Sequence, residues 1–111
     1  MLCLGERFER INLLLSEGAL EILERLAEVG IGRFTDFRQL KNGRTGKIFS
    51  GNTISTRLKE LISAGAVANE VVAEQGQRRL VGYRLTESGK KALVISLEYE
   101  KKLEKALPEK D

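Results

Sequence analysis

The most constraining feature of the sequence is a change of periodicity in its second half. Segment 52–64 carries its apolar residues at helical spacing, and Gly65 ends it, because glycine readily takes the left-handed conformation that closes a helix. Residues 67–74 and 81–85 then show the β-branched, alternating pattern of strands, with a turn around Gly76 between them. This order predicts a helix that leads directly into a β-hairpin.

Three helices are expected before this unit. An apolar stripe at spacings of four and three predicts the first helix, within residues 4–15. Ser16 is a good N-cap for a second helix, which Gly30 ends. A short third helix is expected to be capped by Thr35 and to run through Leu40.

A long helix is expected after the hairpin. Thr86 is its predicted N-cap, and Pro108 ends it after about Leu107. The predicted fold is therefore mainly α with a small β-hairpin, an α+β class. A length of 111 residues and a hydrophobic content of 41% suit one compact core with further helices at the ends.

The composition excludes several catalytic and metal-binding classes. With no histidine and a single cysteine, neither Ser-His-Asp or Cys-His catalysis nor a usual zinc site can be assembled. The stretch "GRTGK" also fails as a phosphate-binding loop, since Lys41 stands where the first glycine belongs and Ile48 follows Lys47. No apolar run approaches the roughly 18 residues that span a membrane. We therefore expect no enzyme activity, no cofactor, no metal and no membrane partner.

The positive charge is concentrated in two blocks. Residues 33–59 carry seven basic side chains against Asp36 alone, a net charge of +6, and residues 75–91 have a net charge of +4. The segments before and between these blocks, 1–32 and 60–74, are both acidic, each with a net charge of −3. Such segregation indicates an anionic partner, although a single charged block is usually only a solvated face.

Two stretches at the right separation resemble a known domain. "ISTRLKELISAGAV" resembles the recognition helix of the winged helix-turn-helix domain, and "YRLTESGKKAL" at 83–93 is similar to the region after the hairpin in MarR-, PadR- and HxlR-type transcription regulators. The resemblance covers roughly residues 16–93. It implies a recognition helix at about 52–64 in the major groove of DNA and a hairpin tip, 74–80, on the adjacent minor groove or backbone. Loop 41–51 is longer than the tight turn usual in that fold.

The residue types on these elements suit DNA. Asparagine pairs with adenine, arginine or lysine with guanine, and serine or threonine can reach base edges or phosphates. Cations ahead of the helix would contact the sugar-phosphate backbone, which positions a protein without reading sequence. The alternative is that the hydroxyl groups only cap and coat an exposed helix, and that the arginines only solubilise a hairpin edge. The predicted DNA-binding residues are Arg38, Lys41, Arg44, Lys47, Asn52, Thr53, Ser55, Thr56, Arg57, Lys59, Gln77, Arg78 and Arg79.

The two ends of the chain predict a homodimer. The last helix carries an approximate heptad seam and extends past a small domain, so a second chain would have to cover it. Such a dimer would place two recognition helices about 34 Å apart; the alternative is that both apolar stripes pack within one monomer. We expect dimerisation helices at 1–15 and 92–111 around a DNA-binding domain at 16–91. The predicted interface residues are Leu4, Phe8, Ile11, Leu15, Ile95, Tyr99, Leu103 and Ala106.

These features together predict sequence-specific binding of double-stranded DNA by a homodimeric transcription regulator, cytoplasmic and associated with the nucleoid. One alternative is an architectural chromatin protein with little sequence preference. Another is a winged helix used for protein–protein interaction, with its cationic blocks on an acidic protein surface. The ratio of affinity for a selected site to affinity for random DNA separates the sequence-specific regulator from the architectural protein.

Overall fold

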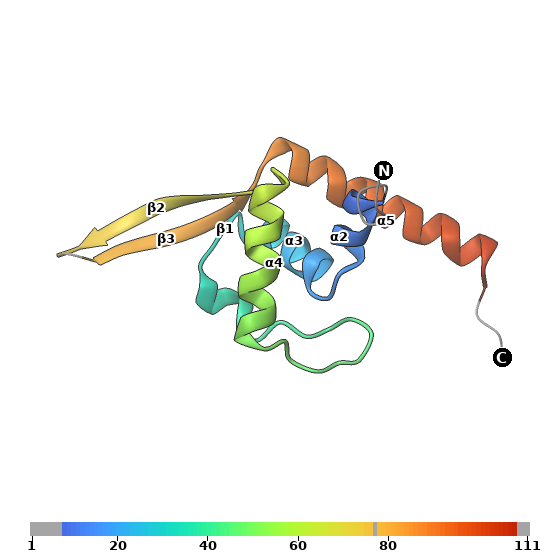
Figure 1. Ribbon diagram of the computed structural model, residues 1–111, viewed down its shortest axis with the longest axis horizontal. Helices are drawn as coiled ribbons and strands as arrows, with labels where there is room; N and C mark the ends of the chain where they lie inside the picture. The colour runs from blue at the N-terminus through green and yellow to red at the C-terminus, as the bar shows by residue number, and fades with distance from the viewer. Residues whose placement is uncertain (1–7, 77, 109–111) are drawn as a thin grey trace, which may run out of the picture.

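The helices gather at the centre of the molecule, while a β-hairpin and the end of the last helix project on opposite sides (Figure 1). The computed structural model describes residues 8–76 and 78–108. Within them the elements are α2 (Glu9–Leu15), α3 (Ala19–Val29), β1 (Ile31–Gly32), the 3₁₀ helix η1 (Phe34–Phe37), α4 (Gly51–Ser63), β2 (Val67–Gln75), β3 (Arg78–Leu85) and α5 (Glu87–Ala106).

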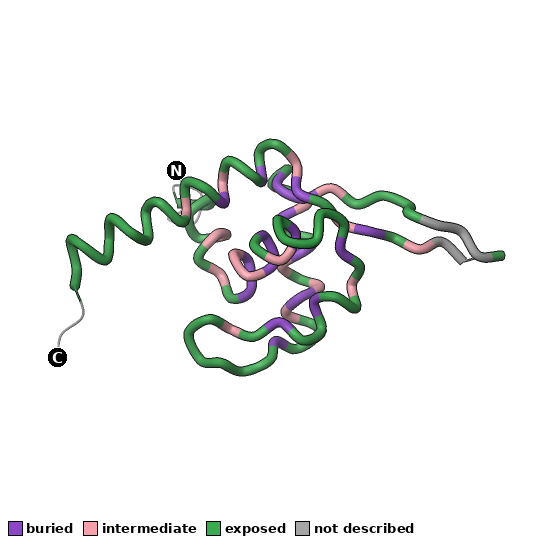
Figure 2. Tube along the Cα trace, turned by 180° about the vertical axis from the view of Figure 1, so that it is seen from behind, coloured by how far each residue is buried: buried purple, intermediate pink, exposed green. Residues whose placement is uncertain are grey.

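Aliphatic side chains of α3, α4 and the base of the sheet form the core, while the second half of α5 is exposed (Figure 2). Phe37 of η1 packs edge-on against Tyr83 of β3, with ring centroids 6.1 Å apart. Each fully buried valine, leucine, isoleucine or phenylalanine side chain contributes about 1.5–3 kcal/mol to stability through removal of apolar surface from water. The side chains at most 2% exposed are Ala19, Ile22, Leu23, Leu26, Phe37, Ile54, Leu61 and Val67.

The N-termini of α4 and α5 are capped by hydroxyl groups. The predicted N-cap of α5, Thr86, is confirmed, because its Oγ1 accepts a hydrogen bond from the Gly89 N–H at 2.9 Å. Helix α4 begins one residue earlier than predicted, since the Ser50 Oγ accepts from the Thr53 N–H at 3.1 Å. A Cβ on Gly89 would lie 2.0 Å from the Ala66 carbonyl oxygen, so α5 starts in direct contact with the segment that leaves α4.

The sheet has one strand more than the predicted hairpin. Its order is β1-β3-β2, with β1 antiparallel to β3 through the pairs Ile31↔Arg84 and Gly32↔Tyr83. A Cβ on Gly82 would lie 2.7 Å from the Ile31 side chain, so this glycine lets β1 pack closely across β3. A register shift between Val71 and Ala73 interrupts the long β2–β3 ladder.

The predicted start of the second helix is wrong. Gly18, with φ of +90°, is the residue that precedes α3, and Ser16 lies outside this helix. The Ser16 Oγ instead donates to the Asn12 carbonyl at 2.7 Å and so caps the end of α2. A hydroxyl between two helices can serve either of them, and here the short turn places it on the first.

The predicted third helix is also wrong in type and start. It is the 3₁₀ turn η1, preceded by Arg33, whose backbone N–H donates to the Asp36 carboxylate at 2.7 Å in place of a cap by Thr35. Phe37 and Leu40, both within the range predicted for this helix, are buried in the core.

The order and pairing of these elements are those of the predicted winged helix-turn-helix fold. In this fold η1 and α4 form the helix-turn-helix, and β2 and β3 form the wing. Across the described residues, no helix combines the length and apolar character that a membrane crossing needs.

Candidate nucleic-acid interface

One side of α4 is polar and exposed. Asn52, Thr56, Lys59 and Ser63 follow one another at helical spacing and are all exposed, and we call this stripe the outer face of α4. The buried residues of α4 lie on the opposite side, as predicted. The outer face therefore presents exposed side chains that can donate and accept hydrogen bonds.

Two further predicted residues of α4 are only partly exposed. Thr53 Oγ1 lies 3.0 Å from the Ser50 Oγ in a hydrogen bond, so this hydroxyl belongs to the helix cap. Ser55 is half-buried. Both residues lie near the N-terminus of α4, where the first backbone amides favour an anion.

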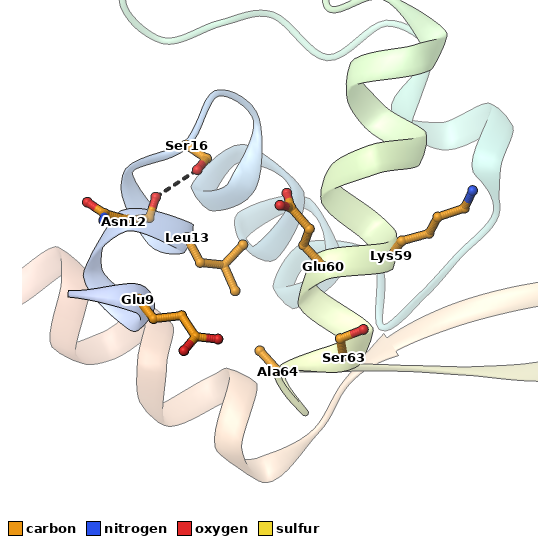
Figure 3. Close-up of a pocket in the computed structure, with 8 residues that line it drawn as sticks. All are labelled: Glu9, Asn12, Leu13, Ser16, Lys59, Glu60, Ser63 and Ala64. Carbon is orange, nitrogen blue, oxygen red and sulfur yellow. Dashed lines mark hydrogen bonds between the residues drawn. The ribbon is translucent and has the colours of Figure 1, made fainter. Parts of the chain in front are cut away.

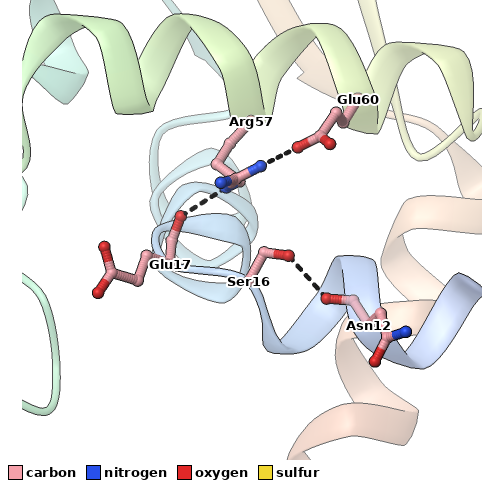
Figure 4. Close-up of polar contacts among 5 residues, drawn as sticks. All are labelled: Asn12, Ser16, Glu17, Arg57 and Glu60. Carbon is pink, nitrogen blue, oxygen red and sulfur yellow. Dashed lines mark hydrogen bonds and ion pairs between the residues drawn. The ribbon is translucent and has the colours of Figure 1, made fainter. Parts of the chain in front are cut away.

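The Arg57 guanidinium is bonded to other residues of the same chain (Figure 4). Its Nε donates to the Glu17 carbonyl at 2.9 Å, and its Nη1 forms an ion pair with Glu60. The side chain is only 21% exposed. Arg57 therefore ties α4 to the turn between α2 and α3, and its guanidinium is less available to a ligand than the sequence predicts.

The long connection before α4 has a defined structure. Lys41 and Ile48 form an isolated antiparallel bridge, and we call the segment between them loop 41–48. The Asn42 N–H donates to the Lys47 carbonyl at 2.8 Å, and the Gly46 N–H donates to the Asn42 carbonyl at 2.8 Å. Gly46 has φ of +74°, which a side chain would strain. The loop is thus a small hairpin rather than the tight turn of the related fold.

The charged side chains of this loop are exposed. Lys41, Arg44 and Lys47 are all solvent-accessible, as are Arg38 after η1 and Lys59 on α4. Within the described ranges, none of these five cations forms an ion pair. Their charge is therefore not paired with a carboxylate of the described residues.

Glu21 of α3 is more than a solvated carboxylate on a helix surface. It is partly buried, and its Oε2 accepts a hydrogen bond from the Gly43 N–H in loop 41–48 at 2.8 Å. The two residues are 22 positions apart in the chain, so no local pattern could have indicated this contact.

The wing carries the second cationic block. Arg78 and Arg79 are the first residues of β3, paired with Gln75 and Glu74 of β2 at the far end of the hairpin. Gln77 lies outside the described residues. The wing leaves the C-terminal end of α4, whereas loop 41–48 lies before its N-terminal end, so the two project on different sides of the helix (Figure 1).

The two terminal helices expose apolar side chains. Ile11 and Leu15 of α2 are 57% and 73% exposed, and Tyr99 of α5 is 62% exposed. Leu13 and Leu14 are the residues with which α2 packs against the core. Of the remaining predicted interface residues, Phe8, Ile95, Leu103 and Ala106 are exposed, and Leu4 lies outside the described residues.

An open cavity of about 500 Å³ lies between α2 and α4 (Figure 3). Its lining includes Glu9 from α2 and Lys59 and Glu60 from α4. No buried side-chain nitrogen or oxygen of the described residues lacks a hydrogen-bond partner, and no group of metal ligands is found among them. Among the described residues, the cavity therefore holds no metal-ligand cluster and no unpaired buried polar group.

Comparison with known proteins gives the fold. No family model and no curated protein matches the sequence. Among solved structures, the reduced form of the transcriptional regulator YodB from B. subtilis matches over 100% of both chains, with 24% identity and a TM-score of 0.72. The structure of ytfH from Salmonella typhimurium matches 92% of this chain and 84% of that one, with 22% identity and a TM-score of 0.67. TA0346 from Thermoplasma acidophilum matches over 95% and 99%, with 23% identity and a TM-score of 0.60.

Proposed function

We propose that the chain is a transcription regulator that inserts the outer face of α4 into the major groove of double-stranded DNA. The observation that carries this proposal is the exposed polar stripe of α4, with cationic segments before and after it in the chain. The similarity in fold to YodB, a transcriptional regulator, supports it. A helix of this kind docks with its N-terminal residues towards the base edges.

The side chains divide into two proposed roles. Asn52, Thr56 and Lys59 would read base edges, because amide, hydroxyl and ammonium groups match the donors and acceptors of the major groove. Thr53 and Ser55 would receive a phosphate at the N-terminus of α4. The cations would contact the sugar-phosphate backbone or the adjacent minor groove, and we assign Arg38, Lys41, Arg44, Lys47, Arg78 and Arg79 to this role. Gln77, which is neutral, would add a hydrogen bond there.

Arg57 is the one predicted contact that we leave out of this set. Its guanidinium already bonds the Glu17 carbonyl and the Glu60 carboxylate. Contact with DNA would require it to leave both partners. We expect it to fix the orientation of α4 instead.

We further propose that two copies bind DNA together. The exposed apolar residues of α2 and α5 form a surface of the kind that marks protein–protein contacts, since monomers seldom expose large contiguous apolar patches. A two-fold dimer through these helices would place two copies of α4 about 34 Å apart, one turn of DNA.

Selection of bound sites from a pool of random duplex DNA tests the proposal. We expect an inverted repeat whose half-sites are about ten base pairs apart. The selected duplex should bind far more tightly than random duplex, and a ratio below about tenfold would favour an architectural role. Absence of duplex binding at low ionic strength would refute the proposed function.

A further inference from the structure

Loop 41–48 is stabilised from within by two of its own side chains, those of Asn42 and Thr45. The Asn42 Oδ1 accepts hydrogen bonds from the backbone N–H groups of Arg44 at 2.8 Å and Thr45 at 3.3 Å. The Thr45 Oγ1 in turn accepts from the Lys47 N–H at 3.2 Å. The backbone of both tip cations is thus fixed by hydroxyl and amide groups of the loop itself.

A single side chain from another element holds the same loop. Among the described residues, Glu21 is the only one outside the loop whose side chain accepts a hydrogen bond from its backbone, at the Gly43 N–H. The turn that leads into α3 is itself bonded to α4, because the Arg57 Nε donates to the Glu17 carbonyl at 2.9 Å. Glu21, one turn further along α3, therefore links the loop to a rigid framework.

We infer that Glu21 is a positioning residue that orders loop 41–48 before DNA binds, and that this acidic side chain thereby strengthens binding to the phosphate backbone. The inference rests on the proposed function. A loop that must become ordered on binding reduces affinity by its lost conformational freedom. A loop that is already held by Glu21 and Asn42 avoids that loss, and it keeps Arg44 and Lys47 available for phosphates.

The sign of the effect makes the inference testable. A carboxylate near DNA repels phosphates, so simple electrostatics predicts that its removal tightens binding. A positioning role predicts the opposite, because removal of the acceptor frees the loop. The two explanations therefore differ in direction and not only in magnitude.

The test compares Glu21→Ala with Glu24→Ala and Glu21→Gln in the full chain. Glu24 is exposed on the same helix and makes no hydrogen bond or ion pair with the described residues. Glu24→Ala therefore removes the same charge as Glu21→Ala without removing a contact. Glu21→Gln removes the charge but keeps an acceptor oxygen. Binding to the selected duplex is measured by fluorescence anisotropy at several salt concentrations, with thermal unfolding as a check on the fold.

We expect Glu21→Ala to bind about tenfold more weakly, the usual effect of losing a hydrogen bond to a charged group. Its salt dependence should be shallower by about 0.9 for each phosphate that the freed loop no longer neutralises. Glu24→Ala and Glu21→Gln should bind as tightly as the unchanged protein or more tightly. Asn42→Ala, which changes no charge, should weaken binding as Glu21→Ala does.

Hydrogen exchange of the Gly43 amide in the free protein gives a readout without DNA. We expect exchange to be faster in Glu21→Ala and close to that of the unchanged protein in Glu24→Ala. Equal exchange in both variants, or binding by Glu21→Ala as tight as that by Glu24→Ala, overturns the inference while the proposed function stands. Failure of the unchanged protein to bind duplex DNA overturns the proposed function and the effect on affinity together, and the exchange measurement then decides the ordering of the loop alone.

Discussion

Loop 41–48 and the wing both carry cations, on different sides of α4, but the two elements are held in different ways. The loop is short, closed by a bridge between Lys41 and Ile48, and bonded to Glu21 of α3. The wing is a long ribbon of two strands, β2 and β3. The short strand β1 pairs with β3 at the base of this ribbon, at Tyr83 and Arg84. Isolated two-stranded hairpins are marginally stable in water. Because β1 supports only the base of this sheet, we expect the wing to lose more conformational freedom on binding than the loop does.

Equal charges on the loop and on the wing therefore need not contribute equally to affinity for DNA. Cations on a held element contact phosphates at little entropic cost, whereas those on a free ribbon are offset by the ordering of the ribbon. In exchange, a free ribbon can adapt to the width of a minor groove, which varies with DNA sequence. We therefore expect the loop to contribute mainly to affinity for DNA, and the wing mainly to adjustment to the width of the minor groove.

The largest effect is expected from the loop. Removal of its three cations in Lys41→Ala, Arg44→Ala, Lys47→Ala should weaken duplex binding by about a thousandfold at physiological salt, because a dimer would leave up to about six phosphates without a cationic partner. The slope of log affinity against log salt should become shallower by roughly five. Titrations by anisotropy over a range of salt concentrations measure both quantities.

A triple variant of α5, Lys101→Ala, Lys102→Ala, Lys105→Ala, is the matched control. These lysines are exposed and lie on the part of α5 that projects away from α4. Their substitution removes the same charge at a distance from the residues proposed to contact DNA. An equal loss of affinity in both triple variants would mean that net charge alone, and no particular surface, governs binding.

Loss of the partner chain should affect the loop and the wing alike. Tyr99→Lys places a charge on an exposed apolar seam, so we expect monomers in light scattering and about a hundredfold weaker binding to a two-half-site duplex. Binding to a single half-site should change little. A Tyr99→Lys variant that still scatters light as a dimer would refute this interface, and Tyr99→Phe serves as the conservative control.

A smaller loss is expected from the wing. Arg78→Ala with Arg79→Ala should weaken binding about ten- to thirtyfold and make the salt slope shallower by about 0.9 for each phosphate that these arginines neutralise. Lys90→Ala with Lys91→Ala, two exposed lysines at the start of α5, removes the same charge and should have little effect. If the double variant of the wing loses more affinity for duplex DNA than the triple variant of the loop, the order proposed for the two elements is wrong.

The sequence predicted the elements whose signals are local. Thr86 caps α5 and Ile54 and Leu58 face the core, because a cap and a helical stripe are properties of a few neighbouring residues. The strand β1 carries no such signal, since two residues have no periodicity and Ile31 and Gly32 are a strand only through their partners on β3. Contacts with distant residues define such an element, and a single sequence does not contain them.

The candidate site shows the same division. The exposure of Asn52, Thr56 and Lys59 was predicted, because it follows from the helical stripe that buries the opposite face. The contacts of Arg57 with Glu17 and of Glu21 with Gly43 were not predicted, since these partners lie 40 and 22 positions apart. The Asn-Gly pair at 42–43 is a turn signal that could have indicated a hairpin within the loop.

The smallest effect on affinity, and the largest on sequence preference, is expected from the outer face of α4. Asn52→Ala and Thr56→Ala remove groups that would contact base edges, and neither changes the charge that the loop and the wing supply. Binding to random duplex should therefore stay within about twofold, because phosphate contacts dominate it. Discrimination against a changed base pair at the contacted position should fall by about 1–3 kcal/mol. Lys91→Ala serves as a control outside this face, and an equal loss on selected and random duplexes would assign these residues to phosphate contact along with the loop and the wing.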